Sequence, residues 1–131
     1  MLKDCLVEAN IPASDLKRAR EFYADTLGLT PSGEFEDVMS RYTTTGGTSF
    51  IVYQTDNAGT GKHTIAQWHV KDLDAEVRDL QAKGVEFEVY DLPGVTWDGP
   101  VASLPGLGRS AWFQDSEGNT MCLDEPSGEW A

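Results

Sequence analysis

The sequence contains two copies of one pattern, and this internal repeat constrains the fold more than any other feature. Each copy has a short apolar stretch, a capping aspartate, a helix-like segment and a closing glycine. Asp72 follows Asp15 by 57 positions, and Gly84 follows Gly28 by 56. Because 131 residues hold only two copies of this length, the repeat indicates a duplicated supersecondary unit and not a solenoid. We expect the two units to close around one shared cavity.

Length and composition fit one globular domain, with 40% hydrophobic and 24% charged residues. The chain has no apolar run near the roughly 18 residues that a membrane helix needs, and its start has no signal-peptide core. We therefore expect a cytoplasmic protein without membrane contact. The net charge of −12 would repel nucleic-acid phosphates, so no nucleic acid is expected as a partner. This charge would attract a cationic small molecule, although an acidic surface also serves solubility alone.

Hydrophobic periodicity and turn residues predict a strand, a helix and three strands in each copy. In the first copy the strands are expected at 5–11, 31–36, 39–45 and 48–55, and the helix at 15–26. In the second they are expected at 65–70, 85–90, 109–114 and 120–124, with a helix at 72–83. Residues 56–63 are interpreted as a linker. The glycine- and proline-rich stretch 91–107 is interpreted as a lid or binding loop. Cys5 and Cys122 are expected to be reduced core residues and not a disulfide.

Several motifs carry a family resemblance. Residues 11–16 lead to Phe22-Tyr23 and to the Leu-Gly-Leu of 27–29, and the turn 115–119 precedes the last strand. With the duplicated order, these motifs resemble the vicinal oxygen chelate superfamily over nearly the whole chain. That group includes glyoxalase I, bleomycin-resistance proteins, fosfomycin-resistance enzymes and extradiol dioxygenases. Residues 87–94 are also similar to a branch known only as glyoxalase-like.

The resemblance implies an α+β fold with two tandem βαβββ modules that form an open eight-stranded curved sheet around a cavity. The modules would span about 4–56 and about 64–125 of a single domain covering 1–131. The resemblance also implies a homodimer, formed either with the modules of one chain paired or with modules exchanged between chains.

The resemblance also implies where a metal would be bound. Enzymes of the superfamily hold a divalent metal with His, Glu or Gln side chains from the first and last strands of each copy. The corresponding positions here are Glu8, Ile51, Ile65 and Cys122. The isoleucines have no lone pair, and one carboxylate with one thiol is fewer than the three protein ligands of most catalytic sites. We therefore expect no metal and no other cofactor.

Alternation along the strands assigns the side chains to two faces. The helix side is expected to receive Val7, Ala9, Ile11, Ala66, Trp68, Val70, Met121 and Leu123. The cavity side is expected to receive Glu8, Asn10, Ile65, Gln67, His69, Thr120, Cys122 and Asp124. A cavity that mixes a carboxylate, amides, an imidazole and aliphatic surface suits an organic ligand of medium size.

The candidate ligand-binding residues are Glu8, Asn10, Tyr42, Gln67, His69, Trp97, Arg109, Trp112 and Cys122. Trp97, in the glycine- and proline-rich loop, is assigned to stacking on a ligand or on a dimer mate. Arg109 would meet an anionic group. The face of Trp112 stays open. Glu8, with a pKa raised by burial, and His69 are the candidate catalytic acid or base, against the alternatives of a hydrated carboxylate and a rim histidine.

The sequence leaves three functions open. The first is metal-independent binding or sequestration of a small organic ligand, a drug or a metabolite, as in the bleomycin-resistance branch. Four tryptophans and the acidic surface favour an aromatic or cationic ligand for it. The alternative is a glyoxalase-type lyase, isomerase or dioxygenase with Glu8 or His69 as acid or base. A structural or regulatory dimer without a ligand is the third possibility.

Overall fold

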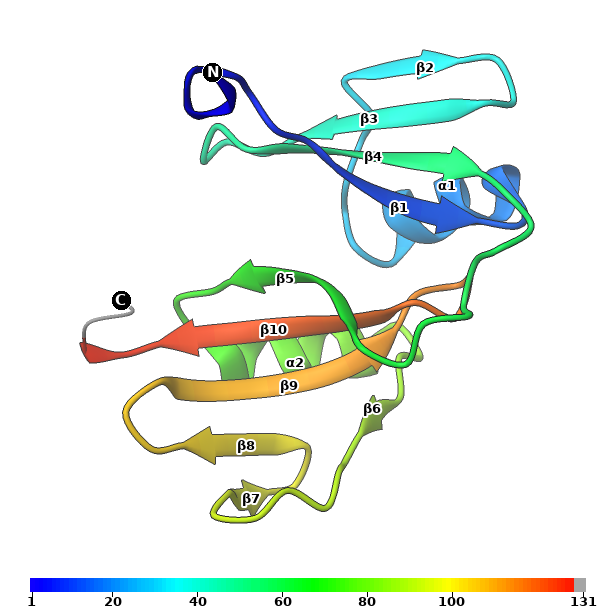
Figure 1. Ribbon diagram of the computed structural model, residues 1–131. Helices are drawn as coiled ribbons and strands as arrows, with labels where there is room; N and C mark the ends of the chain where they lie inside the picture. Colours follow the sequence, from blue (N-terminus) through cyan, green and yellow to red (C-terminus); the bar gives the residue numbers. More distant parts are fainter. Residues whose placement is uncertain (129–131) are drawn as a thin grey trace.

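The computed structural model describes residues 1–128, which form two α-helices and ten strands in two mixed sheets (Figure 1). The first module consists of a 3-10 turn at Leu2–Asp4, β1 (Ala9–Ala13), α1 (Leu16–Asp25), β2 (Gly33–Phe35), β3 (Met39–Thr43) and β4 (Ser49–Gln54). The second consists of β5 (Thr64–His69), α2 (Leu73–Ala82), β6 (Phe87–Glu88), β7 (Thr96–Asp98), β8 (Val101–Leu104), β9 (Gly108–Gln114) and β10 (Thr120–Pro126). No helix of this described part is long and apolar enough to cross a membrane.

The two aspartates that define the repeat have the same structural role. The Asp15 carboxylate accepts a hydrogen bond from the Arg18 backbone N–H at 3.1 Å, and the Asp72 carboxylate accepts one from Ala75 at the same distance. Each thereby caps the first turn of its helix, an interaction that stabilises a helix by about 1 kcal/mol. The prediction of both helix starts is confirmed.

Each sheet contains one parallel strand pair in the same structural position. The first sheet has the order β1-β4-β3-β2, with β1 parallel to β4. The second has the order β5-β10-β9-β8-β7, with β5 parallel to β10 and β6 paired to β9. Asn10 lies opposite Ile51 in the first pair, and Gln67 lies opposite Cys122 in the second. The register therefore shows that Ile51 and Cys122 occupy equivalent positions, as the repeat predicts.

The expectation of a long loop over 91–107 is wrong, because this stretch contains the hairpin β7–β8. Asp98 pairs with Val101, and the two residues between them make the turn, with Gly99 at a φ of +59°. Glycine at the first of the two turn positions is a hairpin signal, since glycine adopts positive φ without steric cost. The hairpin extends the second sheet to six strands, where four were expected.

The first strand begins later than predicted. It starts at Ala9, which lies opposite Phe50 near the beginning of β4, so the residues before Ala9 have almost no strand to pair with. Leu6 and Val7 are 100% and 91% exposed. Val7 and Ala9 are both exposed, so the prediction that they pack under the helix is wrong, whereas Ile11 is buried. Both cysteines are free; Cys122 is buried as expected, but Cys5 is exposed, so its expected core position is wrong.

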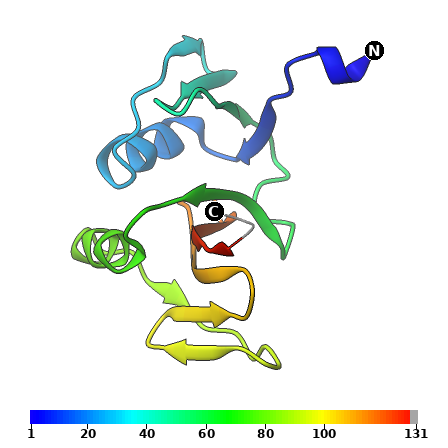
Figure 2. The same ribbon diagram turned by 90° about the vertical axis from the view of Figure 1, so that its left-hand side faces the viewer.

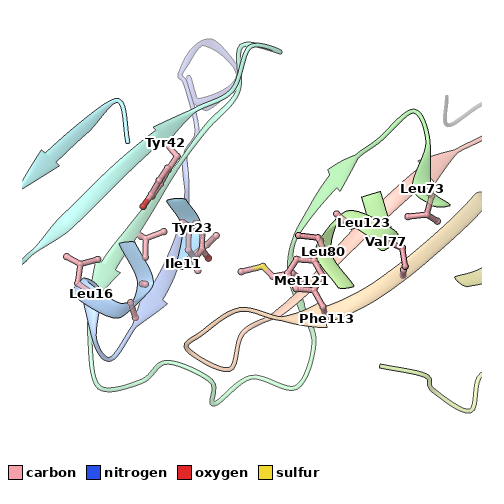
Figure 3. Close-up of a cluster of buried hydrophobic side chains, with 14 of the residues drawn as sticks. Ile11, Leu16, Tyr23, Tyr42, Leu73, Val77, Leu80, Phe113, Met121 and Leu123 are labelled. Atoms are coloured by element: carbon pink, nitrogen blue, oxygen red, sulfur yellow. The ribbon is translucent and has the colours of Figure 1, made fainter. Parts of the chain in front are cut away.

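One hydrophobic core runs through both modules on the helix side of the sheets. Both helices lie on the same side of the molecule (Figure 2). The core side chains come from both modules (Figure 3): Ile11, Leu16, Tyr23 and Tyr42 from the first, and Leu73, Val77, Leu80, Phe113, Met121 and Leu123 from the second. Phe50 and Trp68 meet edge to face between the modules, with ring centroids 6.1 Å apart. The opposite faces of the sheets therefore remain free of helices.

The turn between β9 and β10 joins the second module to the start of α1. The Glu117 side chain is fully buried and accepts hydrogen bonds from the Asp15 backbone N–H at 2.9 Å and from Arg18 Nε at 2.8 Å. The Tyr23 hydroxyl donates to Asp115 at 2.8 Å, and the Asn119 amide donates to the Pro12 carbonyl at the same distance. The 115–119 motif is thus a clamp between the modules of one chain.

Candidate functional site

The candidate site lies on the face of the second sheet opposite α2, called here the open face. Alternation along β9 and β10 turns Ala111, Phe113, Met121 and Leu123 toward the core and the intervening residues to the open face. Two cross-strand rows result. The first consists of Gln67, Cys122 and Trp112, and the second consists of His69, Asp124 and Ser110.

These rows form one wall of a pocket of about 250 Å³. Its lining residues are Thr64, Gln67, His69, Leu104, Leu107, Ser110, Trp112, Cys122 and Asp124. Four of the candidate residues from the sequence, Gln67, His69, Trp112 and Cys122, therefore lie around one hollow. The face of Trp112, which the sequence left open, is the pocket face.

The Trp112 ring is held in place by three neighbours. Its indole N–H donates to the Thr64 hydroxyl at 3.2 Å. The rings of Tyr90 and Trp97 pack against it with centroid distances of 5.7 and 5.9 Å. Trp97 thus lies on a strand and supports Trp112, and it does not line the pocket. A ring fixed in this way presents a preorganised surface for another planar group.

Tyr90 is itself fixed, because its hydroxyl donates to the Glu88 carboxylate. Burial and this hydrogen bond raise the pKa of Tyr90 to about 12, so the phenol stays neutral under ordinary conditions.

The polar side of the pocket is organised by Asp124. One carboxylate oxygen accepts from the Ser110 hydroxyl at 3.1 Å, and the other lies 3.0 Å from His69 Nδ1. Cys122 precedes Asp124 by two residues on β10 and lies opposite Trp112 of β9. Burial raises the pKa of the Cys122 thiol to about 11, so it stays protonated at neutral pH and is a poor nucleophile.

Glu8 and Asn10 belong to the first sheet, and the structure does not bring them to this pocket. Arg41 donates two hydrogen bonds to Glu8 at 2.9 and 3.0 Å, and the Ser49 hydroxyl donates a third at 2.7 Å. The bonds from Ser49 and Arg41 lower the pKa of Glu8. The expectation that burial raises this pKa is wrong, because the partners stabilise the charged form.

Two other candidates lie on the core side of their strands. Tyr42 is 1% exposed and stacks on Phe50 with a centroid distance of 5.2 Å, so its expected role as a rim contact is wrong. Arg109 precedes Ser110 by one residue and therefore faces away from the pocket. It forms ion pairs with Asp74 and Glu125, both at 3.1 Å, and the expectation that it meets an anionic ligand group in the cavity is wrong.

Several residues that line the pocket were not predicted from the sequence. Leu104 and Leu107 were hidden in the stretch interpreted as a loop, and Thr64 precedes the predicted strand by one residue. Asp124 was assigned to the cavity face by alternation but was not named as a binding residue. Ser110 lies within the predicted strand at 109–114, but the side chains of that strand were not assigned to faces.

The donors at the metal-ligand positions do not fit a divalent metal. Ile51 and Ile65 offer only hydrocarbon, and the Glu8 carboxylate is occupied by Arg41 and Ser49. The thiol of Cys122 is neutral. Within residues 1–128, no three His, Cys, Asp or Glu side chains are grouped closely enough to hold an ion.

Comparison with known proteins gives one family and several similar structures. A model of the Glyoxalase/Bleomycin resistance protein/Dioxygenase superfamily matches residues 6–123. No curated protein matches the sequence. The structure is similar to that of TnmS3, an antibiotic binding protein from Streptomyces sp. CB03234, with 25% identity, 94% of this chain and 98% of that chain covered, and a TM-score of 0.70.

Two further structures share the fold at lower identity. The fosfomycin resistance protein FosX from Listeria monocytogenes is 18% identical, with 96% and 94% of the two chains covered and a TM-score of 0.69. The lactoylglutathione lyase from Agrobacterium tumefaciens is 15% identical, with 92% of each chain covered and a TM-score of 0.70.

Proposed function

Because the chain belongs to the Glyoxalase/Bleomycin resistance protein/Dioxygenase superfamily, we propose that it binds a small organic ligand in the open-face pocket of the second sheet and needs no metal to do so. The observation that carries this proposal is the fixed Trp112 ring beside a hollow with aliphatic and polar walls. Such a mixture of apolar surface and few polar groups is typical of ligand pockets. The similarity to an antibiotic binding protein supports a binding function.

The charge around the pocket favours an aromatic ligand that is neutral or cationic. Asp124 is the acidic residue among the described lining residues of the pocket, which include no lysine or arginine. Arg109, which was expected to meet an anionic group, is paired with Asp74 and Glu125, and Arg41 of the first sheet is paired with Glu8. An anionic ligand would therefore meet uncompensated negative charge in a chain whose net charge is −12.

Tryptophan fluorescence tests this proposal with proflavine, a planar cationic dye, and with fluorescein as its planar anionic counterpart. We expect proflavine to quench the fluorescence saturably and fluorescein to leave it unchanged at equal concentration. Trp112→Ala should weaken proflavine binding at least about fivefold, because stacking contributes about 1 kcal/mol or more.

Trp68→Phe is the matched control, since Trp68 packs on the core side, and it should leave the dye affinity unchanged. An affinity that is the same in the wild type and in Trp112→Ala would contradict the assignment of the pocket. Equal binding of both dyes would contradict the proposed charge preference.

A further inference from the structure

We infer that His69 and Asp124 form a general-base dyad that can remove a proton from a carbon acid bound against Trp112. This inference goes beyond ligand binding but rests on the same pocket. It is carried by the arrangement of three side chains on three neighbouring strands: His69 on β5, Asp124 on β10 and Ser110 on β9.

The Asp124 carboxylate is held by a second hydrogen bond that does not involve the imidazole. Asp124 accepts from Ser110 Oγ at 3.1 Å through one oxygen and lies 3.0 Å from His69 Nδ1 through the other. Its side chain is 17% exposed, so water competes little for it. A carboxylate beside Nδ1 keeps the proton on that nitrogen and leaves the lone pair on Nε2. The dyad therefore holds the imidazole in the tautomer that a base requires.

The rest of the pocket favours His69 as the base. Cys122 is protonated, and Glu8 lies on the other sheet in an ion pair with Arg41. His69 and Asp124 both line the same hollow as Trp112 and the two leucines of its apolar wall, Leu104 and Leu107. A planar carbon acid bound in this hollow would thus share it with an oriented base, and general-base catalysis requires that base to come within hydrogen-bond reach of the proton.

The chemistry of such a dyad can be measured with 5-nitrobenzisoxazole, a planar carbon acid. The base removes the proton from C3 of the heterocycle. The electrons of this C–H bond form the C≡N bond, the ring N–O bond breaks, and its electrons leave on the phenolate oxygen. The proton ends on His69 Nε2 and passes to water, so no oxidant, reductant or metal takes part in the step.

We expect the wild-type protein to convert this probe with saturation kinetics. His69→Ala should lower kcat at least about 100-fold, the contribution typical of a positioned base, and added imidazole should restore part of the loss. His63→Ala is the matched control, because His63 is the chain's other histidine and lies outside the pocket. Asp124→Asn should lower kcat with little change in KM, as expected for a positioning residue.

The outcomes separate this inference from the proposed binding function. A wild-type rate no greater than that of free imidazole at equal concentration would overturn the dyad, as would a His69→Ala variant that folds and keeps full activity. Saturable dye binding would stand unaffected by either result. Conversely, a His69-dependent rate whose KM is unchanged in Trp112→Ala would support the base but contradict the binding of the carbon acid against Trp112, and with it the binding pocket. His69→Gln, with circular dichroism of each variant, provides a second test should the alanine variant not fold.

Discussion

At the scale of single residues, two tyrosines in the core of the first module differ by one hydrogen bond. The rings of Tyr23 and Tyr42 lie 5.4 Å apart, and both residues are almost fully buried. The Tyr23 hydroxyl donates to Asp115, whereas the Tyr42 hydroxyl has no partner among the described residues. A buried hydroxyl without a partner costs stability, and a paired one contributes to it.

The two tyrosines therefore predict opposite results for the same substitution. Tyr42→Phe should leave the free energy of unfolding unchanged or raise it by about 1 kcal/mol, because an unpaired polar atom is removed. Tyr23→Phe should lower it by about 1–2 kcal/mol, because the Asp115 carboxylate loses a donor in the core. Urea unfolding of both variants measures these differences. A Tyr42→Phe variant as unstable as Tyr23→Phe would contradict the unpaired state of the Tyr42 hydroxyl among the described residues.

At the scale of elements, the turn between β9 and β10 connects the modules through the buried Glu117 carboxylate. Burial raises the pKa of this group, but the hydrogen bonds from Arg18, the Asp15 backbone and Ser116 lower it more, to about 2. The folded-state pKa is thus below the ordinary value of 4.5, so the ionised form stabilises the fold. This contribution is present above that ordinary value and is lost as the pH falls toward about 2.

We therefore expect the free energy of unfolding to fall by about 3 kcal/mol through this group as the pH is lowered from neutral to about 2. Glu117→Gln should remove that part of the pH dependence and destabilise the protein at neutral pH, because Arg18 would lose its ionised partner. Urea unfolding between these pH values measures the effect. Glu21→Gln on the exposed surface of α1 is the matched control. A Glu117→Gln variant with the wild-type pH profile would contradict the clamp.

The elements also show how far the sequence predicts this structure. Capping aspartates and closing glycines indicate both helices, because such signals are local in the chain. The start of β1 is not local, since it depends on where β4 begins. Likewise the pairing of His69 with Asp124, 55 residues apart, depends on the register of β5 on β10. The hairpin β7–β8 has a local signal in Gly99 at the first turn position, but the many prolines and glycines of this stretch favoured the prediction of a loop.

At the scale of the whole molecule, the N-terminal arm leaves apolar side chains without cover. Leu6 and Val7 are almost completely exposed, and they lie with Glu8, Arg41 and Ser49 along a groove of about 960 Å³. An exposed apolar segment of this kind is typical of an interface between chains. This is consistent with the homodimer that we expect for this chain.

The arm allows this expectation to be tested. The wild-type chain should be a dimer by light scattering at micromolar concentration. Leu6→Glu together with Val7→Glu should shift it toward a monomer, because burying two carboxylates in an apolar interface is costly. Val89→Glu, at an exposed apolar position of the second module, serves as the comparison for a general effect of added charge. A wild-type protein that is monomeric at all concentrations would contradict the expected dimer.

The most direct test of metal-independent binding is the proflavine affinity of the protein before and after removal of divalent metals. The side chains at Ile51 and Ile65 predict the same dissociation constant in untreated protein, in protein dialysed against a chelator and in protein resupplied with zinc, nickel or manganese. A dye affinity that is lost with the chelator and restored by one of these metals would contradict the account.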